Sequence, residues 1–282
     1  MTRSSSHTRT CSRSTRSTPG RRVRSSRHPS KTRRHGQAGR RRSSRVPEQP
    51  GDVVAAYLHG VEVDASFHQS LLGTVMRSAL TTRRLLRFLP NWCGSGGLVA
   101  ARNETVARFL QMDGAEWLWW IDSDMGFETD ALDRLLEVAH PKSRPMVGGL
   151  CFAQKGAEPD GFGGFRTRVV PALYRWHQAG DRAGFAAWEN YPRNTLTEVE
   201  GTGSAFVLIH RSVFEAVLEK HGPRWYDRVP HDTLGLVGED LSFCMRVLDV
   251  GIPIHVHTGI TTTHRKPWWI GEADYQHPDM EA

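Results

Sequence analysis

The sequence predicts a single α/β domain built on a mostly parallel central sheet that is flanked by helices. Short apolar runs alternate with segments whose apolar residues recur every three or four positions, which is the pattern of strands joined by crossover helices. The run from Trp117 to Ile121 is apolar throughout, as expected of a central strand covered on both faces. Residues 51–282 are long enough to enclose one sizeable core.

The elements of the first half follow from their apolar periodicity. We expect a first strand at 52–60, a helix through Phe67 and Val75, and a flexible glycine-rich loop at 93–97, whose order of residues fits neither a P-loop nor GxGxxG. Further elements are expected as follows: a helix at 99–110, a strand at 117–121, a helix at 129–138 with Thr129 as N-cap, and a strand at 146–150.

The second half is less regular. We expect strands at 170–176, 196–201, 204–209 and 254–256, and helices around Val213 to Leu218 and Leu241 to Leu248. There is no internal repeat.

Residues 1–50 differ in composition from the rest of the chain. They hold 15 Lys and Arg against one acid, Glu48, whereas the remainder holds 22 basic and 29 acidic residues. With almost no large apolar side chain, this Arg- and Ser-rich tail is expected to be disordered. It could be an arm that contacts nucleic acid or another polyanion, a solubilising tail, or translated sequence upstream of the true start. Because no aromatic residues interleave its charges, we favour a tail without function.

Targeting signals and cysteine spacing point to a cytoplasmic protein. The basic tail is not followed by an apolar stretch, as a signal peptide would be, and no apolar run is long enough to cross a bilayer. The four cysteines lie far apart and form neither a zinc knuckle nor a disulfide framework: Cys11, Cys93, Cys151 and Cys244. We therefore expect a soluble protein with reduced thiols and no transmembrane segment.

Two carboxylates follow the apolar strand directly. Asp122 and Asp124 come at its carboxyl end, where ligands of open α/β sheets bind. Carboxylates two residues apart at a strand-to-loop turn can hold one hard divalent cation, which keeps positions open for phosphate oxygens. The alternative is that Asp122 caps a turn and Asp124 is solvated. The strand before the pair and the helix after it favour the metal.

These motifs together resemble a known family. WLWWIDSDMGF at 117–127, with ARN at 101–103 ahead of it and GED at 238–240 behind it, is similar to nucleotide-sugar glycosyltransferases of the GT-A fold, close to family 2-like enzymes of bacteria and phages. The resemblance covers most of residues 52–266. It implies a Rossmann-like GT-A domain over residues 51–282.

The resemblance implies how a sugar donor would be bound. Asp122, Ser123 and Asp124 match the DxD motif, whose carboxylates would hold Mn²⁺ or Mg²⁺ on the diphosphate of a UDP- or GDP-sugar. A Lewis-acid metal neutralises the charge that develops on the leaving diphosphate. Arg102 and Asn103 match residues that line the nucleotide side of the pocket, although Arg102 could equally be a surface residue near a helix start.

The resemblance also implies a base and a third metal ligand. Asp240, with Glu239 as second choice, matches the acid that removes the acceptor proton in inverting members. Acids in the first turn of a helix are also stabilised by its dipole, whatever the function. His264 matches a position that ligates metal in several such enzymes, with Arg265 or Lys266 adding charge toward phosphate.

Other candidates are less specific. Gly203 precedes an apolar strand, where related enzymes bring a glycine-rich turn against a sugar, or where glycine simply permits a turn. Four aromatic residues are candidates for sugar stacking or for the core: Trp188, Tyr191, Trp225 and Tyr226.

The sequence therefore predicts a metal-dependent glycosyltransferase that acts on an unknown acceptor, a glycan, a protein or a modified nucleic acid. A nucleotidyltransferase would use the same metal and diphosphate and stays open, as does a non-catalytic protein that binds polyanions through its tail. A phosphatase of the haloacid dehalogenase type is disfavoured, because its DxD motif usually lies near the start of the domain.

Overall fold

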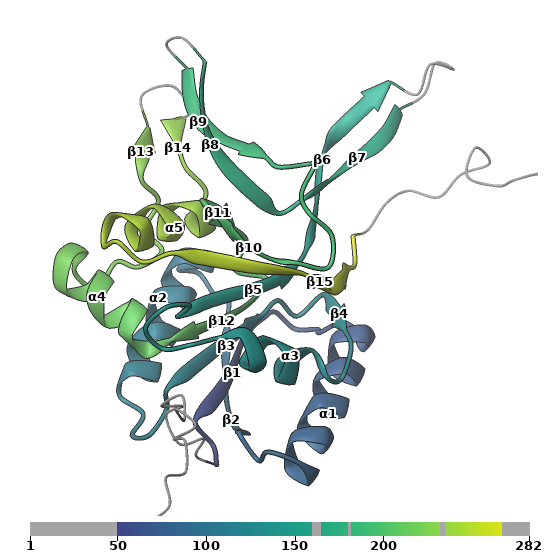
Figure 1. The fold of residues 1–282 in the computed structure, drawn as a ribbon, viewed down its shortest axis with the longest axis vertical. Helices are drawn as coiled ribbons and strands as arrows, with labels where there is room; N and C mark the ends of the chain where they lie inside the picture. The colour runs from purple at the N-terminus through teal and green to yellow at the C-terminus, as the bar shows by residue number, and fades with distance from the viewer. Residues whose placement is uncertain (1–49, 160–164, 180–181, 232–234, 267–282) are drawn as a thin grey trace, which may run out of the picture. The chain divides into compact units, whose positions relative to one another are not determined.

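The computed structural model describes residues 50–159, 165–179, 182–231 and 235–266, and a central eight-stranded sheet dominates them (Figure 1). Seven strands follow one another across this sheet and the eighth, β4, pairs with β15. Their order is β10 (Leu196–Val199), β15 (Ile254–His264), β5 (Met146–Leu150), β12 (Phe206–His210), β3 (Trp117–Ile121), β1 (Val53–His59) and β2 (Leu85–Trp92), with β4 at Met125–Phe127.

Most strands of this sheet point the same way. β1 pairs in parallel with β2 and β3, and β15 pairs in parallel with β5. β12 is antiparallel to both β3 and β5, so that these two strands share one direction, while β10 and β4 are antiparallel to β15. The prediction of a mostly parallel sheet is confirmed, and the reversed strand β12 lies in its middle, between β5 and β3.

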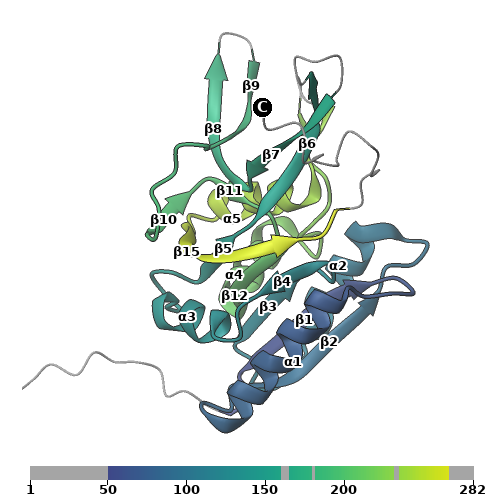
Figure 2. The same ribbon diagram turned by 90° about the vertical axis from the view of Figure 1, so that its right-hand side faces the viewer.

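Helices cover the sheet on both faces (Figure 2). The layer on one face contains α1 (Ala65–Leu80) and α3 (Ala131–Val138), and the layer on the other contains α2 (Gly97–Leu110), α4 (Arg211–His221) and α5 (Glu239–Asp249). Strand β3 is buried throughout: Trp117, Trp119 and Ile121 pack toward the α1 layer, while Leu118 and Trp120 pack toward the α2 layer. The predicted doubly covered strand is confirmed.

Three smaller sheets extend from this body (Figure 1). Strands β6 (Phe152–Pro159) and β7 (Phe165–Pro171) form a hairpin, and β13 (Pro230–His231) pairs with β14 (Gly235–Leu236). Strand β8 (Leu173–Ala179) pairs on one side with β9 (Arg182–Ala187) and on the other with the two-residue strand β11 (Gly201–Thr202). β11 also contacts α5, which connects this small sheet to the main body.

Several predicted boundaries are wrong. The edge strand β2 was not expected, because Arg87 and Pro90 interrupt its apolar residues. Helix α3 is preceded by Asp130 rather than capped by Thr129. The single strand expected at 170–176 is split between β7 and β8, and the strand expected at 196–201 is split between β10 and β11. The short strand expected at 254–256 continues as β15 to His264.

The remaining expectations are met in part. The described residues belong to one compact unit that spans residues 45–282. Among them, no helix is long and apolar enough to span a membrane, and Cys93, Cys151 and Cys244 are free thiols. Cys11 and the tail predicted at residues 1–50 lie outside the described residues, except for Pro50.

Candidate functional site

Arg102 of helix α2 lies at the centre of the candidate site. Its side chain is 2% exposed, and its Nη2 atom lies 3.1 Å from Oδ1 of Asp122 and 3.7 Å from Oδ1 of Asp240. The guanidinium carbon lies 4.9 Å from the ring centroid of Trp120 and 5.4 Å from that of Tyr226. The alternative of a surface arginine is therefore wrong: Arg102 is a buried cation that joins two of the predicted site carboxylates.

Electrostatics keep this arginine charged. Burial alone would lower the pKa of Arg102, but the carboxylates of Asp240 and Asp122 outweigh it and raise the pKa above its usual value. The Nε and Nη1 atoms of Arg102 and the Oδ1 atom of Asp240 are buried and have no hydrogen-bond partner among the described residues.

The two predicted acids of helix α5 face different partners. Asp240, with a side chain that is 28% exposed, faces Arg102, whereas Oε2 of Glu239 lies 3.8 Å from Nη2 of Arg228. Gly203 lies close to Asp240, because a Cβ atom built on it would be 3.7 Å from Oδ2 of that carboxylate. The structure thus brings Asp240 and Gly203 together with Arg102 and Asp122, and turns Glu239 toward another cation.

A second cluster forms around Asp124 on the other side of the DxD turn. Oδ2 of Asp124 lies 3.0 Å from Nε2 of His264 and 3.2 Å from Nζ of Lys266, and this ammonium group also contacts His264 Nε2. Nδ1 of His264 lies 3.0 Å from the carbonyl oxygen of Phe152, to which it donates when protonated. The same chain segment is fixed by a hydrogen bond from the Arg265 amide to the Asp124 carbonyl, at 2.9 Å.

The pKa values in this second cluster favour an ion pair. Burial raises the pKa of Asp124, but hydrogen bonds and charge from His264 and Lys266 outweigh burial and lower it. Burial lowers the pKa of His264, and its bonds to Asp124 and to the Phe152 carbonyl outweigh burial and raise it. Asp124 is therefore held in an ion pair rather than simply solvated, and a function for the carboxylate pair stays a prediction.

The three predicted metal ligands do not form one cluster. Among the described residues, no group of three or more His, Cys, Asp and Glu side chains could share a metal ion. Asp122 is hydrogen-bonded to Arg102. Asp124 and His264 instead both contact the Lys266 ammonium, which occupies the position from which a metal ion would contact their side chains. Mg²⁺ is often held by one or two carboxylates plus substrate phosphates. The pair of Asp124 and His264 therefore fits a metal ion whose remaining ligands come from the substrate.

Asn103 and Ser123 have structural contacts in this arrangement. Nδ2 of Asn103 donates to Oδ1 of Asp227 at 2.8 Å, and its Oδ1 accepts from the Tyr226 amide at 2.9 Å. The carbonyl of Ser123 accepts from the amide of Asp64 at 2.9 Å. Asn103 therefore holds the segment that places Tyr226 beside Arg102, and its predicted role in nucleotide binding stays a prediction.

The aromatic residues divide between core and surface. Trp225 and Tyr226 are buried in the core, at 2% and 0% exposure, so sugar stacking on them is ruled out in this structure. Trp188 and Tyr191 are partly buried against the same core. Sequence reasoning missed Trp120 as a partner of Arg102. The alternation of side chains along the buried strand β3 could have indicated that Trp120 faces helix α2.

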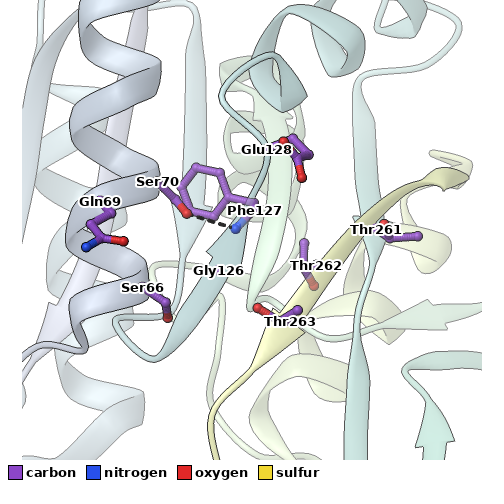
Figure 3. Close-up of a pocket in the computed structure, with 9 residues that line it drawn as sticks. All are labelled: Ser66, Gln69, Ser70, Gly126, Phe127, Glu128, Thr261, Thr262 and Thr263. Atoms are coloured by element: carbon purple, nitrogen blue, oxygen red, sulfur yellow. Dashed lines mark hydrogen bonds between the residues drawn. The ribbon is translucent and has the colours of Figure 1, made fainter.

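A polar pocket of about 280 Å³ lies beside the DxD turn, between α1, β4 and β15 (Figure 3). Hydroxyl groups of Ser66, Ser70 and Thr263 line it, and the Ser70 hydroxyl accepts a hydrogen bond from the Phe127 amide at 3.0 Å. Thr263 precedes His264 in β15, so the two side chains point to opposite faces of the strand. The pocket therefore contains none of the predicted site residues.

Comparisons with known proteins give only a distant structural likeness. No protein-family model and no curated protein matches the chain. Among solved structures, it is similar to the crystal structure of A197 from STIV, with 16% sequence identity and a TM-score of 0.44. That match covers 76% of this chain and 86% of the other. No function is carried over to this chain from a likeness of this level.

Proposed function

We propose that the chain is a metal-dependent glycosyltransferase of the GT-A type that transfers a sugar from a nucleoside diphosphate sugar to an acceptor hydroxyl. One observation carries the proposal: buried Arg102 joins Asp122, at the carboxyl end of the central strand, to Asp240, at the start of helix α5. Asp240 keeps one buried oxygen without a hydrogen-bond partner among the described residues. That oxygen faces Arg102, and because the side chain of Asp240 is 28% exposed, a substrate hydroxyl could reach the carboxylate through its other oxygen.

In the proposed reaction, Asp240 acts as the base. Its carboxylate accepts the proton of the acceptor hydroxyl while the acceptor oxygen bonds to the anomeric carbon, and the bond from that carbon to the diphosphate oxygen breaks. Arg102 orients Asp240 and holds a permanent positive charge beside it. This assignment applies to transfer with inversion, in which the base lies opposite the leaving group.

Asp124 and His264 are the proposed ligands of Mn²⁺ or Mg²⁺. Their oxygen and nitrogen atoms face one point, where the Lys266 ammonium lies in this structure. A bound metal would supply Lewis-acid stabilisation of the leaving diphosphate. Asp122 would face the donor in this scheme, since its carboxylate is 33% exposed and is oriented by Arg102.

The experiment measures hydrolysis of UDP- and GDP-sugars in the presence of Mn²⁺. Asp124→Ala and Asp240→Asn are compared with the parent protein and with Asp113→Ala, which removes an exposed carboxylate outside the site. We expect Asp124→Ala to reduce turnover by about 100-fold, a typical effect of removing charge stabilisation from a leaving group. Equal turnover in Asp124→Ala and the parent, or a parent that binds no nucleotide sugar, contradicts the proposal.

The same assay separates transfer of sugars from transfer of nucleotides. A nucleotidyltransferase would release pyrophosphate from a nucleoside triphosphate and a sugar 1-phosphate, whereas the proposed enzyme releases a nucleoside diphosphate. Detection of pyrophosphate release that depends on Asp124, without release of diphosphate from nucleotide sugars, would replace the present proposal by that alternative.

A further inference from the structure

A row of aromatic side chains runs along the small sheet that contacts helix α5. The ring of Phe185 in β9 lies 6.4 Å from that of Tyr174 and 5.1 Å from that of Trp176, both in β8. Trp176 in turn lies 5.6 Å from the ring of His231 in β13. We call Tyr174, Phe185, Trp176 and His231 the aromatic row; two separate hairpins contribute to it.

The inner end of the aromatic row reaches the proposed base. Tyr174 pairs with Gly201 of β11, and a Cβ atom built on Gly201 would lie 2.7 Å from Leu241 and 3.2 Å from Phe185. Leu241 is the residue after Asp240. The pKa of Tyr174 is raised first by burial and then by the negative charge of Asp240, as expected of neighbouring groups. The row therefore begins near the start of helix α5, next to the residue that follows Asp240.

The outer end of the aromatic row is exposed and well fixed. Trp176 is 37% exposed, although edge contacts with Phe185 and His231 hold its ring. Its backbone amide donates to Oε2 of Glu200 at 2.6 Å. Gln178, two residues further along β8, is exposed on the same face of the strand and offers an amide to a ligand. Figure 1 shows β8 and β9 rising from the end of the molecule where β11 meets α5.

Trp188 does not offer the same surface. The guanidinium carbon of Arg175 lies 4.3 Å from the centroid of its ring, so a cation already covers it. Of the tryptophans near α5, Trp225 is buried in the core and Trp188 is covered, which leaves Trp176 with an exposed ring.

We propose that Trp176 is a stacking platform for a saccharide acceptor, whose sugar residues extend from Asp240 along the aromatic row. The inference rests on the proposed glycosyltransferase function and names its acceptor class. A pyranose ring presents a face of C–H groups that packs on an aromatic ring, while its hydroxyl groups bond to polar neighbours such as Gln178. Nucleobases also stack on tryptophan, but the acidic balance of residues 51–282 opposes a polyanionic acceptor.

The first experiment measures binding without a donor. Maltotetraose, cellotetraose and tetra-N-acetylchitotetraose are titrated separately into the full chain, and binding is followed by saturation-transfer difference NMR. We expect at least one of them to bind the parent and to bind Trp176→Ala about tenfold more weakly, the loss expected from one aromatic contact. The matched control is Trp92→Ala, because Trp92 is an exposed tryptophan of the edge strand β2.

The second experiment uses the oligosaccharide that binds as the acceptor. In Trp176→Ala we expect the KM for this acceptor to rise about tenfold, while hydrolysis of the nucleotide sugar by water is unchanged. Trp176→Tyr should restore most of the acceptor affinity, which guards against a variant that is merely misfolded. Equal melting temperatures of the three proteins complete this control.

The outcomes are distinguishable. The inference is overturned if Trp176→Ala binds the oligosaccharide as well as the parent does, if Trp92→Ala loses as much affinity, or if none of the three oligosaccharides binds. It is also overturned if a single-stranded oligonucleotide binds in their place. Binding that depends on Trp176, in a protein that hydrolyses no nucleotide sugar, would support the saccharide site and count against the proposed function alone.

Discussion

Nε2 of His264 lies 3.0 Å from Oδ2 of Asp124, although 140 positions separate the two residues in the chain. The Lys266 ammonium contacts both atoms. A positively charged side chain thus occupies the point at which the best pair of metal-binding atoms converges. A divalent cation would have to displace this ammonium, so the contact lowers the apparent affinity of the site for metal.

Removal of the ammonium should therefore strengthen metal binding. We expect Lys266→Met to bind Mn²⁺ about tenfold more tightly than the parent, because one charge no longer competes for Asp124. Binding is measured by electron paramagnetic resonance of free Mn²⁺. Arg265→Met is the control, since that side chain pairs instead with Asp64, at 3.2 Å. Weaker binding by Lys266→Met would mean that the lysine helps to hold the substrate or the metal.

Loss of the central cation should destabilise the fold. Arg102→Met leaves two carboxylates beside a buried apolar side chain, and we expect the free energy of unfolding to fall by about 3 kcal/mol, the lower end for a broken buried pair, because both carboxylates are partly exposed. Urea denaturation measures the change. Arg87→Met is the comparison: its Nη1 donates to a backbone carbonyl at 2.7 Å, and its loss should cost about 1 kcal/mol. Equal losses in both variants would contradict a special role for Arg102.

Close packing under helix α5 should make Gly201 intolerant of a side chain. An added Cβ atom would lie 2.7 Å from Cδ2 of Leu241 and 3.2 Å from the ring of Phe185, so Gly201→Ala must displace the Leu241 side chain, which belongs to the helix that carries Asp240. We expect a loss of about 1–3 kcal/mol in the free energy of unfolding, as for other overpacked sites. Gly60→Ala meets no atom within 4 Å and should change stability by less than about 0.5 kcal/mol. Comparable melting curves for the two variants would show that the helix start adapts freely.

Acidification should weaken the protein through partly buried histidines. Burial lowers the pKa of His255, and the charge of Arg144 lowers it further. These two effects outweigh the nearby carboxylate of Glu198, which raises the pKa. Its buried Nδ1 has no hydrogen-bond partner among the described residues. The unfolded chain then binds more protons than the folded protein below about pH 6.5, so stability present above that pH is lost as the pH falls.

The melting temperature checks this expectation between pH 7.5 and 5.5. The decrease over this range should be about 2 °C smaller in His255→Gln than in the parent. His210 and His257 also have pKa values lowered chiefly by burial, so the variant should keep part of the decrease. The exposed His68→Gln serves as control. A decrease of the same size in His255→Gln and the parent would contradict the assignment.

The sequence was sufficient for the centre of the fold. The five apolar residues of β3 could be recognised because a strand covered on both faces has no polar side, and the helices beside it keep their apolar spacing. The edge strand β2 was not recognised because its exposed face carries apolar residues together with Pro90, while Arg87 interrupts the face that holds buried Leu85 and Leu89, so no alternation of apolar and polar residues is visible. The full length of β15 could not be predicted from the sequence, because Thr261 to His264 are polar.

The candidate site could be predicted in its members but not in its contacts. Asp122 and Asp124 were found through their position at the end of a strand, whereas Asp240 and His264 were found through the resemblance to GT-A glycosyltransferases. The burial of Arg102 could not be predicted, because an arginine near a helix start is usually exposed. The rings that cover it, Trp120 and Tyr226, also come from segments far apart in the chain. The role of Trp176 was hidden for the same reason, since its neighbours lie on other strands.

Strand β15 has a consequence for how the molecule is assembled. It is inserted between β10 and β5 and pairs in parallel with β5, more than one hundred residues earlier in the chain. Strand β15 can pair with β5 only after it has been synthesised. Because long loops close slowly, we expect this pairing to be a late step of folding. His264, at the end of the strand, arrives only then. The contact between His264 and Asp124 can therefore form only after strand β15 has docked.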